Sequence, residues 1–249
     1  MQAACQRPRV AHGLLLHADM RSCSLLITVA CALAGCEAAA DPSGLADQLI
    51  AIRDRMHTRF AATSNIRTAI ALGDLERVHA EARVIAQLDE PDMLPQWQPY
   101  VANISDAAAQ ITTSTSTVGA ARTLAALGRR CAQCHEAAGA KIAFARVPSP
   151  VRDVKLASEM ADHQWAAARL WEGLIGPSQP LWLAGANGLA DARLAVTAES
   201  GELGVADDVA RVRLLARRAQ RARTGDDRAQ LFGELLGTCA HCHFTIRDR

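Results

Sequence analysis

Two five-residue motifs contain the residues best suited to chemistry in this chain of 249 residues. They run from Cys131 to His135 (CAQCH) and from Cys239 to His243 (CAHCH). In a Cys-x-x-Cys-His motif the two thiols can add across the two vinyl groups of one haem, and the histidine can bind its iron. On a helix these three side chains share a face, because residues three and four positions apart are neighbours. The motifs therefore predict two covalently bound c-type haems, attached through Cys131, Cys134, Cys239 and Cys242, with His135 and His243 as proximal iron ligands.

A zinc site is the main alternative use of the cysteine pairs. The two pairs begin 108 positions apart (239 − 131), whereas the pairs of a zinc ribbon are separated by roughly 15–20 residues. Each pair also has its own histidine, which a shared four-thiolate site would not need. A thioredoxin-like redox pair would require a βαβ context, and no such pattern is visible. These two alternatives are therefore disfavoured.

Composition excludes several classes of function. The chain has 27 Lys and Arg against 26 Asp and Glu, for a net charge of +1, so nothing in its electrostatics indicates binding to nucleic acid. Aromatic residues make up only 4% of the chain, and two haems would supply large flat apolar groups that the side chains do not. We see no catalytic triad, paired carboxylates or phosphate-binding loop. We therefore expect an electron carrier instead of an enzyme, alone or as a subunit of a larger redox enzyme.

The first 36 residues read as an export signal. An apolar run covers residues 25–33 and is too short to span a membrane. It ends in Leu33-Ala34-Gly35-Cys36, which resembles the bacterial lipobox; that resemblance implies cleavage before Cys36 and lipidation of its thiol. Charged residues interrupt the stretch before Met20, so Met20 is the expected true start. We predict a signal region over 1–36, a tether over 37–44, and a lipid-anchored protein on the periplasmic side of a bacterial membrane.

The rest of the chain reads as helices arranged in two repeats. Apolar residues recur at helical spacing from Leu45 onward, with Gly73 as a helix stop and Asp74 as the next N-cap. Four helices are predicted over residues 45–138 and four over 153–249, joined by a Pro-containing linker over 139–152. Each set ends with a Cys-x-x-Cys-His motif on its last helix. The predicted fold is all-α, with two tandem up-down-up-down four-helix bundles.

This organisation resembles cytochrome c′ and its low-spin relatives, in which a four-helix bundle carries Cys-x-x-Cys-His on its last helix. The resemblance covers residues 45–138 and 153–247. Arg247, four residues after His243, matches a basic residue that is frequent in that family, whereas the first repeat has Gly139 at that place. Members of the family often dimerise through their early helices. A pseudo-dimer of the two repeats within one chain is one arrangement compatible with the resemblance.

The residue on the other side of each iron decides the function. Met56 and Met160 lie 75 and 79 positions before their cysteine pairs (131 − 56 and 239 − 160), about where the low-spin relatives have an axial methionine. We therefore predict Met56 and Met160 as distal iron ligands. Two alternatives stay open: the methionines fill gaps in the core, or a histidine is the ligand, His163 for the second haem or His57 for the first.

Three functions follow from these alternatives. A thioether or imidazole on the distal side favours electron transfer with redox partner proteins. An open distal side would instead allow binding of a small gas such as nitric oxide or carbon monoxide. The third possibility is a structural lipoprotein without haem.

Overall fold

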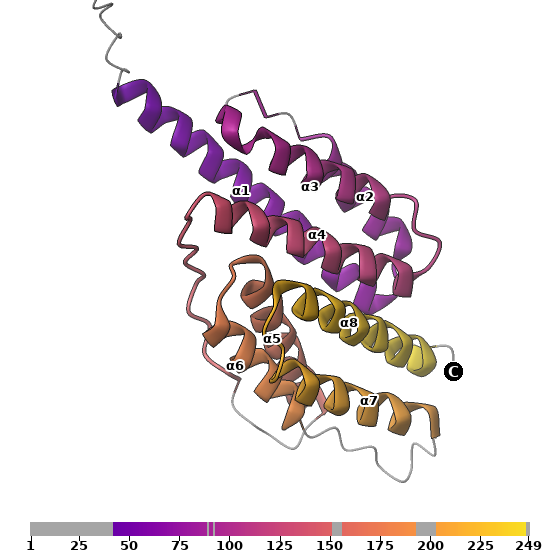
Figure 1. The fold of residues 1–249 in the computed structure, drawn as a ribbon. Helices are drawn as coiled ribbons and strands as arrows, with labels where there is room; N and C mark the ends of the chain where they lie inside the picture. Colours follow the sequence, from indigo (N-terminus) through magenta and orange to yellow (C-terminus); the bar gives the residue numbers. More distant parts are fainter. Residues whose placement is uncertain (1–41, 89, 92, 151–155, 193–202, 248–249) are drawn as a thin grey trace, which may run out of the picture. The chain divides into compact units, whose positions relative to one another are not determined.

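The described part of the chain is helical throughout. The computed structural model describes residues 42–88, 90–91, 93–150, 156–192 and 203–247. Every regular element in these ranges is a helix, which confirms the all-α prediction. The elements in chain order are α1 (Pro42–Leu72), α2 (Leu75–Ala86), the short 3₁₀ helix η1 (Pro95–Trp97), α3 (Gln98–Ile111), α4 (Thr117–Ala137), α5 (Leu156–Ile175), α6 (Gln179–Ala190), α7 (Leu203–Ala219) and α8 (Gly225–Arg247) (Figure 1).

The predicted boundary between the first two helices is confirmed. Gly73 has a φ of 76°, in the left-handed region that favours glycine, and it ends α1. Its N–H donates to the Ile70 carbonyl, and the Asp74 N–H donates to the Ala69 carbonyl. The Asp74 side chain then accepts a 3.0 Å hydrogen bond from the Arg77 N–H at the start of α2.

Three other boundaries differ from the sequence prediction. Helix α1 begins at Pro42, inside the stretch predicted as a tether, because proline is well tolerated in the first turn of a helix. Helix α6 ends at Ala190, whereas the sequence predicts a helix that reaches about Thr197. The sequence also predicts a Gly-rich loop over 199–204 and a helix from about Asp207, whereas α7 already begins at Leu203. Gly204 lies in its first turn, where backbone N–H groups have no partner within the helix in any case.

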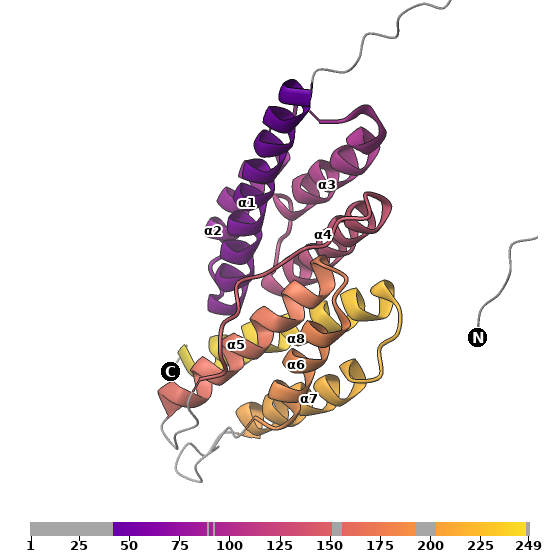
Figure 2. The ribbon, with the colours of Figure 1, turned by 90° about the vertical axis from the view of Figure 1, so that its left-hand side faces the viewer.

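The two sets of helices share one core. Contacts within the chain group residues 46–249 into one compact unit and the preceding residues into another. In the larger unit, α2 packs on α3 and α3 on α4, while α5, α6, α7 and α8 pack in sequence. The most extensive helix contact described joins α4 to α8, and α5 also touches both (Figures 1 and 2). Buried residues from both sets form a single continuous hydrophobic cluster.

Helices α4 and α8 are antiparallel and approach closely through small residues. A Cβ placed on Gly233 of α8 would lie 3.3 Å from the Ala125 Cβ of α4. Gly225 lies against Arg129, near the end of α4, whereas Gly237 lies against Val118, near its start. The two motifs therefore lie toward opposite ends of this helix pair.

Helix α6 is seated directly on the backbone of α5. A Cβ on Gly185 would lie 2.5 Å from the Ala166 carbonyl oxygen and 2.6 Å from the Leu170 nitrogen. The indole N–H of Trp182, in the same helix, donates a 2.8 Å hydrogen bond to the Ala219 carbonyl at the end of α7. This close contact holds α5, which takes part in the candidate site.

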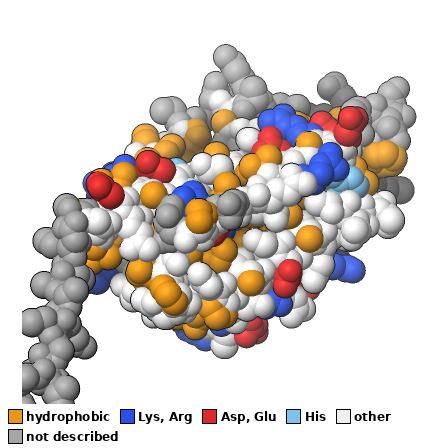
Figure 3. All heavy atoms as spheres, turned by 90° about the horizontal axis from the view of Figure 1, so that it is seen from above, with side chains coloured by type: hydrophobic (Ala, Val, Ile, Leu, Met, Phe, Trp, Pro, Cys, Tyr) orange, Lys and Arg blue, Asp and Glu red, His pale blue; other side chains and the backbone are white. Residues whose placement is uncertain are grey.

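The surface mixes both signs of charge. On the face drawn in Figure 3, Lys and Arg side chains lie near Asp and Glu side chains, with hydrophobic side chains between them. Among the described helices, none combines the length and the apolar character needed to cross a membrane.

Candidate haem sites

The four motif cysteines lie in the last turns of α4 and α8 as thiols, none of them in a disulfide. Cys131 and Cys134 pack against the main core. Burial raises the pKa of Cys131 and of Cys239 to about 12, and it also raises the pKa of Cys134. These buried thiols are protonated at neutral pH. Addition of an S–H group across a vinyl C=C bond consumes no oxidant, so these thiols have the chemical form that haem attachment requires.

His135 is held by the end of a helix from the other set. Its Nδ1 lies 2.7 Å from the carbonyl oxygen of Ile175, the last residue of α5. A carbonyl oxygen only accepts, so Nδ1 carries the hydrogen and Nε2 keeps its lone pair. Burial lowers the pKa of His135, and the hydrogen bond to Ile175 offsets part of that effect. The ring is therefore neutral, oriented, and able to donate to a metal through Nε2.

His243 has the same arrangement at the other end of the α4–α8 pair. Its Nδ1 lies 2.8 Å from the carbonyl oxygen of Ala71, in the last turn of α1. Carbonyls in the last turn of a helix have no partner within that helix. The N–H groups of Gly73 and Asp74 satisfy Ile70 and Ala69, and the His243 ring satisfies Ala71.

The two histidine contacts are reciprocal. Ala71 and Ile175 are 104 positions apart (175 − 71), which is also the separation of Met56 and Met160 (160 − 56). Each set of helices therefore supplies the same carbonyl to the histidine of the other set. The C-terminal end of a helix carries partial negative charge, and an Nδ1–H bond to such an acceptor fixes the ring and raises the basicity of Nε2. This is the usual environment of a histidine that binds a metal.

The two motifs are too far apart to share one metal ion. The contacts of Gly225 with Arg129 and of Gly237 with Val118 set the register of the antiparallel pair. At a rise of about 1.5 Å per residue, Cys131 and Cys239 lie roughly 20 Å apart along the helices. A four-thiolate zinc site would need all four sulfur atoms within about 2.3 Å of one ion. In the described part of the chain, no group of three or more His, Cys, Asp or Glu side chains is arranged to hold a metal ion.

A buried cation lies beside the first motif. Arg59 of α1 is only 4% exposed, and its guanidinium pairs with the Glu90 carboxylate at 2.6 Å. Its charge is close enough to act on the thiols of both Cys131 and Cys134. A guanidinium in this place suits an anionic group such as a haem propionate, because charge-assisted hydrogen bonds to carboxylates are strong.

Met56 lies against a different part of the core. It is half-buried and packs on a small separate cluster made by Ile52, Met93 and Val101. Cys131 and Cys134 pack instead on the main cluster. The structure therefore gives the Met56 side chain an apolar packing role, one turn of helix from Arg59.

The second motif has different neighbours. The Asp208 carboxylate of α7 accepts a 2.8 Å hydrogen bond from the His241 Nδ1. His163 of α5 is half-buried, and its Nε2 is shielded from solvent without a hydrogen-bond partner. Burial lowers the pKa of His163 to about 4, with Asp162 opposing and His243 adding to the shift. Met160 is half-buried one turn before His163.

Comparison of the chain with protein-family models, with curated proteins and with solved structures finds no match. Its chemistry is therefore argued from its own residues.

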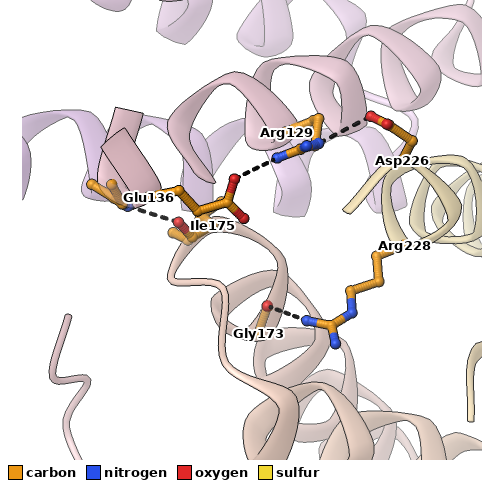
Figure 4. Close-up of polar contacts among 7 residues, drawn as sticks. Arg129, Glu136, Gly173, Ile175, Asp226 and Arg228 are labelled. Carbon is orange, nitrogen blue, oxygen red and sulfur yellow. Dashed lines mark hydrogen bonds and ion pairs between the residues drawn. The ribbon is translucent and has the colours of Figure 1, made fainter. Parts of the chain in front are cut away.

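Two arginines fix the helix ends that form the first site. Arg129 bridges Asp226 of α8 and Glu136 of α4, at 3.0 and 3.2 Å (Figure 4). Arg228 donates a hydrogen bond to the Gly173 carbonyl, two residues before the end of α5. These contacts tie α8 to α4 and to the part of α5 that carries Ile175.

Several groups of the candidate haem sites were not predicted from the sequence. The acceptors of Ala71 and Ile175 are backbone carbonyls, which no residue type reveals; only the glycines that follow α1 and α5 hint at helix ends there. Nothing in the sequence pattern assigned Arg59 to the first motif. The predicted lipidation site Cys36 lies outside the described residues, as does the side chain of Arg247.

Proposed function

We propose that this protein is a dihaem c-type cytochrome that transfers electrons at the periplasmic face of a bacterial membrane, anchored there by a lipid on Cys36. The observation that carries the proposal is the pair of Cys-x-x-Cys-His motifs whose histidines both direct Nδ1 to a helix-terminal carbonyl. Four cysteine thiols, none of them in a disulfide, supply the attachment points. In this proposal the two sets of helices are tandem haem-binding bundles that pack as a pseudo-dimer.

A haem held at each motif would supply one iron that can take up and release one electron. The chain would then accept one electron per haem from a reduced protein donor and pass it to an oxidised acceptor. The chain's own residues hold and tune these groups. His135 and His243 bind through Nε2, while the carbonyls of Ile175 and Ala71 fix the rings. For the first haem, Met56 remains the predicted distal ligand. For the second haem, Met160 is the ligand predicted from the sequence, and His163 is the alternative. A thioether ligand raises the reduction potential relative to a second imidazole.

The test is covalent haem in the mature protein. The full chain is produced in a bacterium that attaches c-type haem outside the cytoplasm, then purified and run on a denaturing gel stained for haem. We expect two haems per chain in a haemochrome assay and one in the Cys131→Ala/Cys134→Ala variant. A protein that carries no haem would refute the proposal and favour the structural lipoprotein.

Electron transfer itself is tested on the purified holoprotein. Spectroelectrochemical titration should give reversible one-electron steps that account for both haems. Failure of both haems to be reduced and reoxidised reversibly would refute electron transfer while leaving haem attachment intact.

Binding of a small gas is the second candidate, and one observation favours it for the first haem. Met56 packs on a cluster separate from the one that contacts Cys131 and Cys134. If Met56 stays in that cluster, the first iron keeps an open side. Rapid binding of carbon monoxide to one ferrous haem, unchanged by Met56→Ala, would establish this function; no uptake at either haem would exclude it.

A further inference from the structure

His163 has the features of a metal ligand. It lies on α5, and its Nε2 is buried without a hydrogen-bond partner. A buried polar atom without a partner costs free energy, so such an atom in a folded protein calls for a ligand or a role. The His243 ring lies near enough for its charge to act on His163. His243 is the proximal histidine of the second motif.

The equivalent position in the first set of helices also faces its motif. His163 and Arg59 are 104 positions apart (163 − 59), the same separation as Ala71 and Ile175. Arg59 lies close enough to act on Cys131 and Cys134. The same face of α1 and of α5 is therefore turned toward a Cys-x-x-Cys-His motif. Arg59 and His163, the residues at the equivalent position, would contact the haem bound by that motif.

The side chains at these two positions differ in their ability to bind iron. An imidazole has a nitrogen lone pair to donate, whereas a guanidinium is always protonated and has none. Arg59 already pairs with Glu90 at 2.6 Å. The His243 Nδ1 is bound to the Ala71 carbonyl, so its Nε2 is left for the iron. The unpartnered Nε2 of His163 is thus the nitrogen available for the opposite side of that iron.

We propose that His163 is the sixth ligand of the second haem, so that two imidazoles coordinate this haem. The first haem has no second imidazole ligand. This assignment rests on the dihaem function proposed above and deepens it by making the two haems unequal. Two imidazoles give a lower potential than imidazole with thioether. The second haem is therefore closed to small ligands and lower in potential than a first haem ligated by histidine and methionine.

The experiment uses the full-length holoprotein and the His163→Ala variant, with His79→Ala as the control because the His79 ring of α2 is bonded to the Ser114 carbonyl. Electron paramagnetic resonance and visible spectra of the ferric protein report the spin state of each haem. We expect His163→Ala to convert one of the two haems from low-spin to high-spin while two haems per chain are retained. Added imidazole should restore the low-spin spectrum, and the spectra of His79→Ala should match those of the wild type.

Other outcomes overturn the assignment in distinguishable ways. Two attached haems with an unchanged low-spin spectrum in His163→Ala would refute His163 as a ligand and leave the cytochrome proposal standing. If Met160→Leu loses the low-spin spectrum of one haem and His163→Ala does not, the sixth ligand of the second haem is Met160. A preparation with no haem would refute the cytochrome proposal itself. If His163→Ala does not fold, His163→Met gives the answer: a ligand role predicts a raised potential at one haem, and no shift in potential refutes it.

Discussion

The contact between α5 and α6 makes a sharp prediction for Gly185→Ala. The added methyl carbon would lie 2.5 Å from the Ala166 carbonyl oxygen and 2.6 Å from the Leu170 nitrogen. Both opposing atoms belong to backbone, so no side-chain rotation relieves the clash. The two helices must move apart by nearly 1 Å to reach ordinary contact distance.

The size of the effect follows from two opposing contributions. Alanine is favoured over glycine in a helix by about 1 kcal/mol. Overpacking a close contact costs typically 1–3 kcal/mol, and a clash with backbone belongs at about the upper end. The net loss is about 2 kcal/mol. For a chain of this size each kcal/mol shifts the Tm by roughly 2–4 °C, so the Tm should fall by roughly 4–8 °C.

The matched control is Gly237→Ala in α8, where the new methyl carbon would meet the Val118 Cγ1 at 3.6 Å, an ordinary contact. This variant gains helix propensity without a clash, so it should be more stable than wild type by about 0.5–1 kcal/mol. Both variants are unfolded by heat and by urea and followed by far-UV circular dichroism. Equal stabilities for the two variants would show that the tight α5–α6 contact does not exist in solution.

Three further predictions concern other parts of the chain. Trp182→Phe should lower the free energy of unfolding by about 0.5–1.5 kcal/mol in urea denaturation, because the Ala219 carbonyl loses its 2.8 Å indole donor and keeps only the Ala222 N–H; an unchanged midpoint would refute this role. Burial raises the pKa of the Glu172 carboxyl, and Arg169 only partly offsets it. The folded state therefore holds this proton more tightly than the unfolded chain. The free energy of unfolding of wild type relative to Glu172→Gln should decrease as pH rises from about 4 through the folded pKa. If denaturation measurements give the same difference between the two proteins at every pH, the prediction is contradicted. Cys36→Ser should move the protein from the membrane fraction to the soluble fraction in cell fractionation, and retention in the membrane would exclude the lipid anchor.

Local signals predicted the fold where the deciding interactions are local. Gly73 and Asp74 mark a helix end and a helix start through their own backbone and side-chain preferences, and the structure has both. The start of α7 was predicted too late because Gly204 was read as part of a loop, although the first turn of a helix accepts glycine. Periodicity gives the buried face of a helix but not the identity of its partner. The contact of α4 with α8 therefore could not be predicted from the sequence pattern.

Some groups of the candidate sites could likewise be predicted from the sequence, and others could not. The thiols and histidines of the two motifs are visible in the sequence because their chemistry depends on residue type and spacing. The partners of the histidine rings are main-chain oxygens contributed from 40 and 172 positions away. Residue identity carries no information about such an acceptor. The 104-position offset between Met56 and Met160 already matches Arg59 with His163 in the sequence, but only the structure shows that Arg59 is buried and paired with Glu90.

The exchange of helix-end carbonyls also sets the order in which the chain can be completed during synthesis. The His135 ring has its acceptor 40 residues later, at Ile175, whereas the Ala71 carbonyl receives its donor only 172 residues later, from His243. The last turn of α1 is therefore completed only after α8 has been made. A chain that lacks α8 also lacks the ring that completes α1, so removal of α8 should destabilise the end of α1.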